Sequence, residues 1–341
     1  MNFQLNTHTD PAYHLRPNKA VDRLILLEAV RHLDRFIPFK QTCYIGFGGP
    51  YLEDLKLFQG IFPELKLISI EEDPEKYKRQ IFHKASRNVK LIRSTFSNYL
   101  DSGFPSGQRL IVWLDSTHMT KGAIDEFVTV CMNSGENSVV RLTIPASQPQ
   151  WARGFRADEH GNPLQKAEKL FAEHSPTYLS QYMEFVPNDK EISAKDFLPP
   201  HFYDLLQLFI RTAITLGLSP YSGKRFLPIQ TSVYSDGAPM LSVTGIICTY
   251  DNERAIAKHF SKYFNYGCCS WTKPDIIDVP RLSTKERFHI DSRLPSRVPT
   301  GKAVKQALKY RIGEDDEDHL YKCFQYEKYF ALYPYFERIL P

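Results

Sequence analysis

The sequence predicts an α/β protein whose core is a parallel, doubly wound sheet. Between residues 18 and 146, apolar runs of strand length alternate about five times with segments of helical length, joined by short connections. After residue 146 this alternation stops, and Pro, Gly, charged and scattered aromatic residues follow. We therefore expect a Rossmann-like domain over residues 18–146 and an α+β C-terminal region over residues 147–341 for a substrate or a partner.

Each element of the first region has a local signal. Residues 18–36 place apolar side chains such as Val21 and Leu33 on one helical stripe, with charges opposite. Pro50 and Pro74 stand at the start of two further helical segments, where proline is tolerated. We expect strands over residues 42–48, 65–71, 89–95, 109–116 and 138–145, and helices over residues 50–62, 73–86 and 122–135.

The C-terminal region has fewer regular signals. Residues 201–218 form a strongly amphipathic helical pattern, and two strand-like segments meet at a turn signal over residues 236–239. Asp236 is expected to begin this turn. Ser283 followed by Glu286 predicts a capping box. The aromatic residues near the C-terminus recur at helical spacing, which favours core packing or a protein partner over a base-stacking surface.

Composition excludes few functions. A net charge of +4 over 341 residues neither requires nor excludes binding to nucleic acid, because such binding depends on whether the positive charge collects on one face. The six cysteines include no CxxC pair and no His spaced for zinc, so we expect free thiols and no metal site. The longest apolar stretch is shorter than the roughly 20 residues that span a bilayer. Without a recognisable signal peptide, the expectation is a soluble, cytoplasmic protein that does not bind membranes.

The stretch CYIGFGGPYLED (43–54) contains the main candidate site. Gly46 allows the chain to turn at the end of a strand, and Gly48 and Gly49 allow main chain to approach a ligand closely. Glu71 ends the next strand, where a carboxylate can accept hydrogen bonds from a ribose diol, and Asp115 ends the fourth strand. Glycines after strands and acids that cap helices are also common in α/β proteins, but their agreement in order favours a nucleoside-type site.

These residues resemble the motifs of class I S-adenosylmethionine-dependent methyltransferases. The resemblance lies in YIGFGGP (44–50), ISIEED (68–73) and IVWLDST (111–117), and covers roughly residues 18–146. YHLRPNKAVDR (13–23) and the WLD of the fourth strand are most similar to bacterial O-methyltransferase-like proteins of poorly defined function.

The resemblance implies S-adenosylmethionine as the cofactor and assigns a role to each loop. Gly46, Phe47, Gly48 and Gly49 would line its methionine part, Glu71 would hold the ribose, the segment around Thr95 would touch the adenine, and Asp115 would lie beside the transferred methyl group.

Some positions depart from the family pattern. Tyr44 stands where the family has an acid that helps to hold the methionyl ammonium group, and Pro50 replaces the third glycine. The sequence after the fourth strand is DSTH, which lacks the Asp/Asn-Pro-Pro-aromatic motif of adenine-N6 and cytosine-N4 methyltransferases. A nucleophilic Cys beside proline, needed for cytosine-C5 transfer, is also missing. The loop also lacks the GxGxxG spacing of a dehydrogenase.

The favoured function is methyl transfer to an oxygen of an unknown acceptor. Such a transfer needs alignment and a base, and Asp115 and His118 are the candidate bases. Asp115 could instead be a helix cap or structural acid, and His118 an exposed loop residue. One rival is a catalytically inactive member of the fold that binds a protein partner through its C-terminal region. Another is a component of a bacterial nucleic-acid-handling or antiviral, phage-defence system, which rests on resemblance alone without a nucleic-acid-binding motif.

Overall fold

The structure is a computed structural model that describes residues 16–333 except 39–41, 85, 222 and 297. The chain divides into two compact units. The larger contains residues 28–233 and 238–275, and the smaller contains the described residues of 1–27, 234–237 and 276–341. The compact units are divided at positions other than 146. The division into functional regions over residues 18–146 and 147–341 therefore stays a prediction.

The sheet confirms the predicted α/β, doubly wound class. Its order is β3-β2-β1-β4-β5-β7-β6-β8, and the order reverses beside β1, between β1 and β4. Neighbours from β3 to β5 are parallel, whereas β7 runs antiparallel to β5. The strands are β1 Cys43–Gly46, β2 Lys66–Glu71, β3 Val89–Arg93, β4 Leu110–Asp115, β5 Ser138–Pro145, β6 Lys224–Ser235, β7 Pro239–Thr249 and β8 Asp275–Ile277.

The helices confirm most predicted helical segments and add some that the sequence did not indicate, among them α4. The α-helices are α1 Pro17–Phe36, α2 Glu53–Ile61, α3 Pro74–His83, α4 Phe96–Ser102, α5 Lys121–Asn133, α6 Gln165–Leu179, α7 His201–Leu218, α8 Tyr250–Tyr263, α9 Thr284–Asp291, α10 Lys302–Ala307 and α11 Asp316–Tyr329. Short 3-10 turns are η2 Gln150–Ala152, η3 Met183–Phe185, η4 Ala194–Phe197 and η5 Phe330–Leu332.

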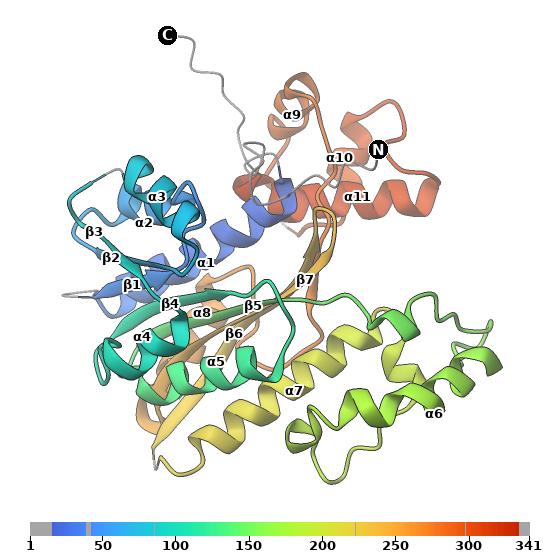
Figure 1. Cartoon of the computed structure of the whole chain (residues 1–341). Helices are drawn as coiled ribbons and strands as arrows, with labels where there is room; N and C mark the ends of the chain where they lie inside the picture. The colour runs from blue at the N-terminus through green and yellow to red at the C-terminus, as the bar shows by residue number, and fades with distance from the viewer. Residues whose placement is uncertain (1–15, 39–41, 85, 222, 297, 334–341) are drawn as a thin grey trace. The chain divides into compact units, whose positions relative to one another are not determined.

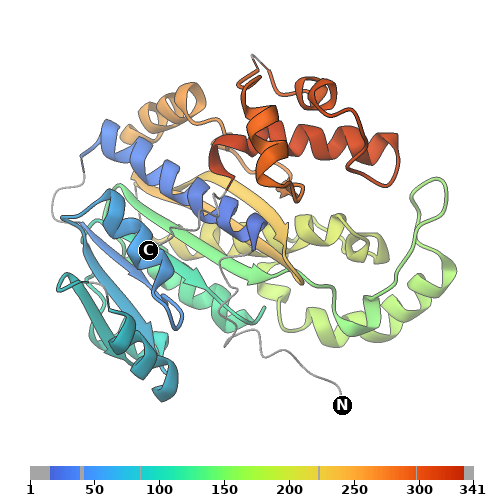
Figure 2. The ribbon, with the colours of Figure 1, turned by 90° about the horizontal axis from the view of Figure 1, so that it is seen from above.

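The largest hydrophobic cluster of the larger unit lies on one face of the sheet. Ile45, Val112 and Leu142 all point to this face and are fully buried with Phe127 of α5 and Phe209 of α7. α5 and α7 pack side by side below the sheet (Figure 1). α2 and α3 lie near β3, whereas α6 lies at the opposite end of this unit (Figures 1 and 2). Residues on both sides of position 146 therefore form one hydrophobic core.

Polar caps set where helices begin in the larger unit. Asp73 Oδ1 accepts hydrogen bonds from the amides of Glu75 and Lys76, both at 2.8 Å, and Pro74 fills the first helical position of α3. These bonds, that of Lys76 foremost, lower the pKa of Asp73. α3 therefore starts three residues after Glu71, the last residue of β2, and this cap fixes the short connection between them.

The smaller unit holds the first half of α1 against the tip of the β6–β7 hairpin. Asp236, expected only to begin a turn, accepts from the amides of Asn18 at 3.4 Å and Lys19 at 2.8 Å, and so caps α1. The side chain of Asn18 donates to Ser235 O at 2.9 Å and accepts from the amide of Val279 at 2.8 Å.

The capping box that the sequence predicted at the start of α9 is confirmed in the smaller unit. Ser283 Oγ accepts from the amide of Glu286 at 3.3 Å, and Glu286 Oε2 accepts from the amide of Ser283 at 2.7 Å. Within the part of the chain that the structure describes, no helix has both the length and the apolar character needed to cross a bilayer.

Candidate functional site

The ends of β1, β2 and β4 lie next to one another. Gly46 pairs with Ser69 of β2 on one side and with Trp113 of β4 on the other. Adjacent strands are about 4.8 Å apart, and side chains two residues further along a strand point to the same face. Glu71 and Asp115, each two residues beyond these partners, therefore flank the loop that follows β1 on a common face of the sheet.

The loop after β1 requires its glycines. Gly48 and Gly49 have φ of +64° and +54°, in the left-handed region. A Cβ on Gly48 would lie 2.8 Å from both Leu52 Cδ2 and Leu55 Cδ1, whereas a Cβ on Gly49 would meet nothing within 4 Å. Gly48 is thus required by packing and backbone conformation together, and Gly49 leaves main chain next to open space.

Two buried polar side chains hold this loop in place. Gln80 Nε2 of α3 donates to the carbonyl oxygens of Phe47 and Gly49, both at 2.9 Å. The hydroxyl of Ser69 lies 2.9 Å from Phe47 O and 3.1 Å from Gln80 Oε1. Gln80 and Ser69 are both fully buried. The bonds from Gln80 and Ser69 hold the loop in place. Among the described residues, the amides of Gly48 and Gly49 donate no hydrogen bond, so two main-chain donors remain for a ligand.

Glu71 is a half-buried carboxylate with one anchored oxygen. Its Oε1 accepts from the amide of Asp73 at 2.9 Å, and Oε2 has no hydrogen-bond partner among the described residues. Burial raises the pKa of Glu71, and the hydrogen bond from Asp73 opposes the rise. An anchored carboxylate with a remaining acceptor oxygen fits a vicinal diol.

The neighbouring loops are linked by aromatic packing and a helix cap. The ring of Phe47 meets that of Phe96 edge to face, with centroids 5.6 Å apart. Thr95 caps α4, where its hydroxyl accepts from the amide of Asn98 at 3.2 Å. The predicted methionine and adenine loops are therefore in contact through Phe47 and Phe96, while Thr95 has a structural role as well.

The two candidate bases differ in their exposure to solvent. Asp115 is half-buried at the end of β4. His118 is exposed, and among the described residues its ring makes no hydrogen bond; only its main chain bonds to Ser116 Oγ. The structure thus places Asp115 at the strand ends and leaves His118 on the surface of the following loop.

Tyr44 belongs to the core. It is fully buried, and its ring stacks on Phe58 with centroids 4.4 Å apart. A Cβ on Gly46 would lie 2.7 Å from the Tyr44 hydroxyl, so Gly46 is needed partly to make room for this tyrosine. A buried tyrosine that packs in the core therefore stands where the resemblance implies a carboxylate.

The segment after β5 reaches the loop that follows β4. Lys121 Nζ lies 2.8 Å from Asp125 Oδ2 and 2.7 Å from Glu184 Oε1 of η3, and Tyr182 donates to Met119 O at 3.2 Å. The contacts of Lys121 with Glu184 and of Tyr182 with Met119 have no local signal in the sequence, because each joins residues about sixty positions apart. They place residues 182–184 beside the loop that holds His118.

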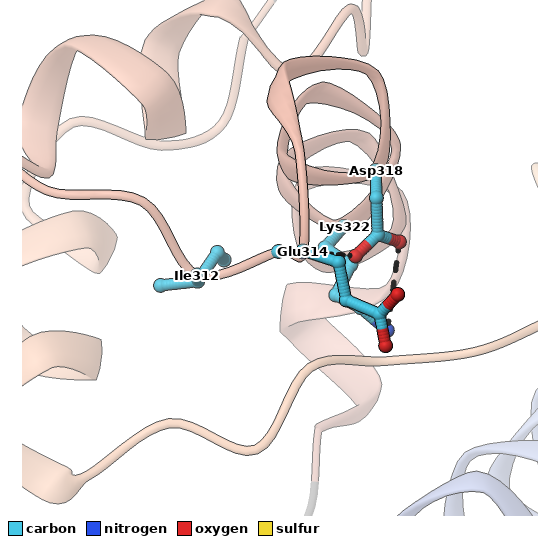
Figure 3. A pocket seen from close by; sticks show the side chains of 5 residues that line it. Ile312, Glu314, Asp318 and Lys322 are labelled. Atoms are coloured by element: carbon cyan, nitrogen blue, oxygen red, sulfur yellow. Dashed lines mark hydrogen bonds and ion pairs between the residues drawn. The ribbon is translucent and has the colours of Figure 1, made fainter.

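A cavity of about 480 Å³ lies in the smaller unit and does not include any predicted site residue. It is lined by Ile312, Gly313, Glu314, Asp318 and Lys322 at the start of α11 (Figure 3). Asp318 Oδ2 accepts from the amide of Glu314 at 2.8 Å and Oδ1 lies 3.9 Å from Lys322 Nζ. Asp318 therefore holds the turn before α11 and lies near the charge of Lys322.

Fold and strand-end site together define a class I S-adenosylmethionine-dependent methyltransferase-like protein. A family model described as "Putative O-methyltransferase" matches residues 11–341, so the chain belongs to this family. No curated protein matches the chain.

Solved structures of methyltransferases are similar to the chain at low identity. The O-methyltransferase TomG from Streptomyces achromogenes, in complex with SAM, has 14% identity over 66% of this chain and 78% of its own, with a TM-score of 0.35. A 16S rRNA (adenine(1408)-N(1))-methyltransferase from Catenulisporales acidiphilia has 11% identity over 66% of this chain and 92% of its own, with a TM-score of 0.34. At these values the likeness bears on neither cofactor nor acceptor.

Proposed function

We propose that the chain binds S-adenosylmethionine at the ends of β1, β2 and β4 and transfers its methyl group to an oxygen of an acceptor. The observation that carries this proposal is the position of Gly48 between Glu71 and Asp115 on one face of the sheet. In open α/β sheets, ligands bind at the carboxyl ends of the strands where the strand order reverses, and these residues lie at that point.

The residues present fit the nucleoside end of this cofactor. Glu71 Oε2 would accept from a ribose hydroxyl, and the free amides of Gly48 and Gly49 would donate to polar groups of the ligand. Thr95 and Phe47 would border the adenine and the methionine chain. When bound, S-adenosylmethionine would supply a methyl group activated by a positively charged sulfur. Because Tyr44 offers no carboxylate to the ammonium group, we expect Glu71 to provide a large share of the affinity.

Asp115 is the preferred base for the acceptor hydroxyl. It is half-buried at the strand ends, where a proton acceptor has to lie, whereas the His118 ring is exposed. We therefore expect Asp115→Asn to abolish methyl transfer and His118→Ala to lower it only a few-fold. A larger loss in His118→Ala than in Asp115→Asn, measured as S-adenosylhomocysteine formed in a screen of hydroxyl-bearing acceptors, would reverse the assignment.

Calorimetric titration with S-adenosylmethionine and S-adenosylhomocysteine tests cofactor binding. Hydrogen bonds to charged groups contribute about 1.5–3 kcal/mol each, so Glu71→Ala should raise Kd at least about tenfold. Glu64→Ala, which removes an exposed carboxylate before β2, is the matched control and should leave Kd unchanged. Absence of binding by the wild-type chain at millimolar ligand would instead favour the rival, a catalytically inactive binding or regulatory subunit.

The remaining expectations stay predictions. They are a protein partner for the C-terminal region, a cytoplasmic location and a role in antiviral defence. A pull-down from the native host with the full chain and with its Phe288→Ala variant, which removes a 66% exposed aromatic side chain of the C-terminal region, would test the first of them.

A further inference from the structure

The net positive charge of the chain is concentrated in one segment. Residues 76–93, here called the basic segment, contain seven Lys or Arg residues and no Asp or Glu. The rest of the chain has 36 Lys or Arg against 39 Asp or Glu and is therefore slightly negative. The seven cations are Lys76, Lys78, Arg79, Lys84, Arg87, Lys90 and Arg93.

Most of these cations face solvent without a protein partner. Lys84, Arg87, Lys90 and Arg93 are exposed, and among the described residues none of them pairs with a carboxylate. Lys78, in contrast, pairs with Glu75 at 2.7 Å. The four unpaired cations therefore present their full charge to a ligand.

The basic segment also carries exposed apolar side chains. Phe82 is 84% exposed and Ile81 is 55% exposed at the end of α3. The Phe82 ring meets the His83 ring in a T-shaped contact with centroids 5.1 Å apart, and most of the Phe82 surface stays exposed. On the adjacent turn of α3, the guanidinium of Arg79 lies 4.9 Å from the ring centre of Tyr51 and donates to its hydroxyl.

The backbone that carries these side chains is anchored. Asn88 donates to Pro63 O at 3.0 Å, and its carbonyl accepts from the amide of Leu67 at 3.2 Å. β3 then pairs with β2 from Val89 to Arg93 at the edge of the sheet. Arg87 and Lys90 therefore lie on either side of the anchored start of β3.

Protection of the sheet edge explains only part of this pattern. Charged residues on an edge strand discourage pairing with another chain, which accounts for Lys90 and Arg93. It does not account for Lys84 and Arg87, which precede the strand, or for an exposed phenylalanine beside them. Exposed cations and an exposed aromatic ring within one short segment are the combination that binds single-stranded nucleic acid, in which phosphates meet the cations and an unpaired base stacks on the ring.

We propose that the basic segment binds the backbone of single-stranded nucleic acid, with Phe82 as a stacking side chain. The basic segment contains neither the glycine loop nor the acids of the methyltransferase-like site, and the proposal does not depend on methyl transfer. Single strands are specified because bases in a duplex are stacked on one another and cannot stack on Phe82.

Fluorescence anisotropy with labelled single strands of about 12 nucleotides, oligo-U RNA and oligo-dT DNA, tests the proposal against a duplex of equal length. Arg87→Glu/Lys90→Glu should weaken single-strand binding at least about tenfold and flatten the slope of log K against log salt by about 1.4, because each phosphate contact contributes about 0.7. Lys166→Glu/Lys169→Glu changes the same charge on exposed positions of α6 and should stay within about twofold of wild type.

Phe82→Ala keeps all charges and tests the stacking contact. It should weaken binding to single strands by about fivefold to a hundredfold and leave duplex binding unchanged. Circular dichroism and urea unfolding of each variant check that the fold is retained. Equal losses in the α6 control, no salt-dependent binding by the wild type, or binding to anionic phosphatidylserine vesicles without binding to oligonucleotides would each overturn the proposal, the last in favour of a membrane surface.

Discussion

Gln80 is the side chain on which the geometry of the glycine loop depends. It is fully buried, and its Nε2 donates to Phe47 O and Gly49 O at 2.9 Å. Gln80→Leu removes both donors at similar side-chain volume. A hydrogen bond contributes about 0.5–1.5 kcal/mol net, so two of them, to half-buried loop residues, correspond to about 1–3 kcal/mol of unfolding free energy.

The consequence for the ligand should exceed the consequence for the fold. Without Gln80 the loop that presents the Gly48 and Gly49 amides loses its fixed position, and binding then has to order it. We expect Gln80→Leu to lower the urea midpoint and to raise the Kd for S-adenosylhomocysteine at least about tenfold. Gln165→Leu, an exposed glutamine at the start of α6, is the control and should change neither value.

Gln80→Glu separates the hydrogen bonds from packing. A carboxylate has no donor and would face two carbonyl oxygens, so this variant should be at least as unstable as Gln80→Leu at pH 7 and recover part of its stability when acid protonates it. If the unfolding free energy of Gln80→Leu lies within about 0.5 kcal/mol of the wild-type value and its Kd for S-adenosylhomocysteine is unchanged, then Gln80 does not hold the glycine loop in place.

Three further perturbations test separate parts of the structure. Gly48→Ala should destabilise the chain by at least about 2 kcal/mol because its Cβ would collide with Leu52 and Leu55, and Gly49→Ala by only about 1 kcal/mol because its Cβ meets open space; equal losses in urea unfolding would contradict this. Since burial raises the pKa of Glu71 in the folded state, its ionised form opposes folding, so its contribution to stability is present at low pH and lost as pH rises through the folded pKa. Glu71→Gln should therefore be more stable than wild type at pH 7, with a gain that shrinks toward pH 4; a gain that grows on acidification would show the wrong sign. Asp236→Ala should cost about 1 kcal/mol, measured by thermal unfolding, through loss of the α1 cap, while Asp236→Asn should retain most of it.

The sequence predicted the strands of the N-terminal half because each buried strand is a short apolar run bounded by turn residues. β1, β2 and β4 end within about two residues of the expected positions, which sufficed to bring Gly48, Glu71 and Asp115 together. α4 was missed because its seven residues, FSNYLDS, give no long helical period.

What the sequence did not reveal depends on contacts distant along the chain. Gln80 appears as a polar residue in a helix, and nothing local indicates that it bonds to carbonyl groups more than thirty positions earlier. Asp236 looked like a turn residue, although it caps a helix 217 positions away. The antiparallel pairing of β7 with β5 is of the same kind, because strand neighbours are chosen by the whole sheet.

The distribution of charge is a different case. The seven cations of the basic segment are visible in the sequence, but a net charge of +4 over the whole chain conceals them. The structure adds that Phe82 of the same segment is exposed and that, among the described residues, Arg87 and Lys90 pair with no carboxylate.

A crystal structure with S-adenosylhomocysteine tests the central claim most directly. We expect the ribose hydroxyls within hydrogen-bond distance of Glu71 Oε2 and main chain at Gly48 or Gly49 in contact with the ligand. Ligand bound away from the ends of β1 and β2, or a Glu71 side chain that faces no part of it, would show that the strand-end loops do not form the cofactor site.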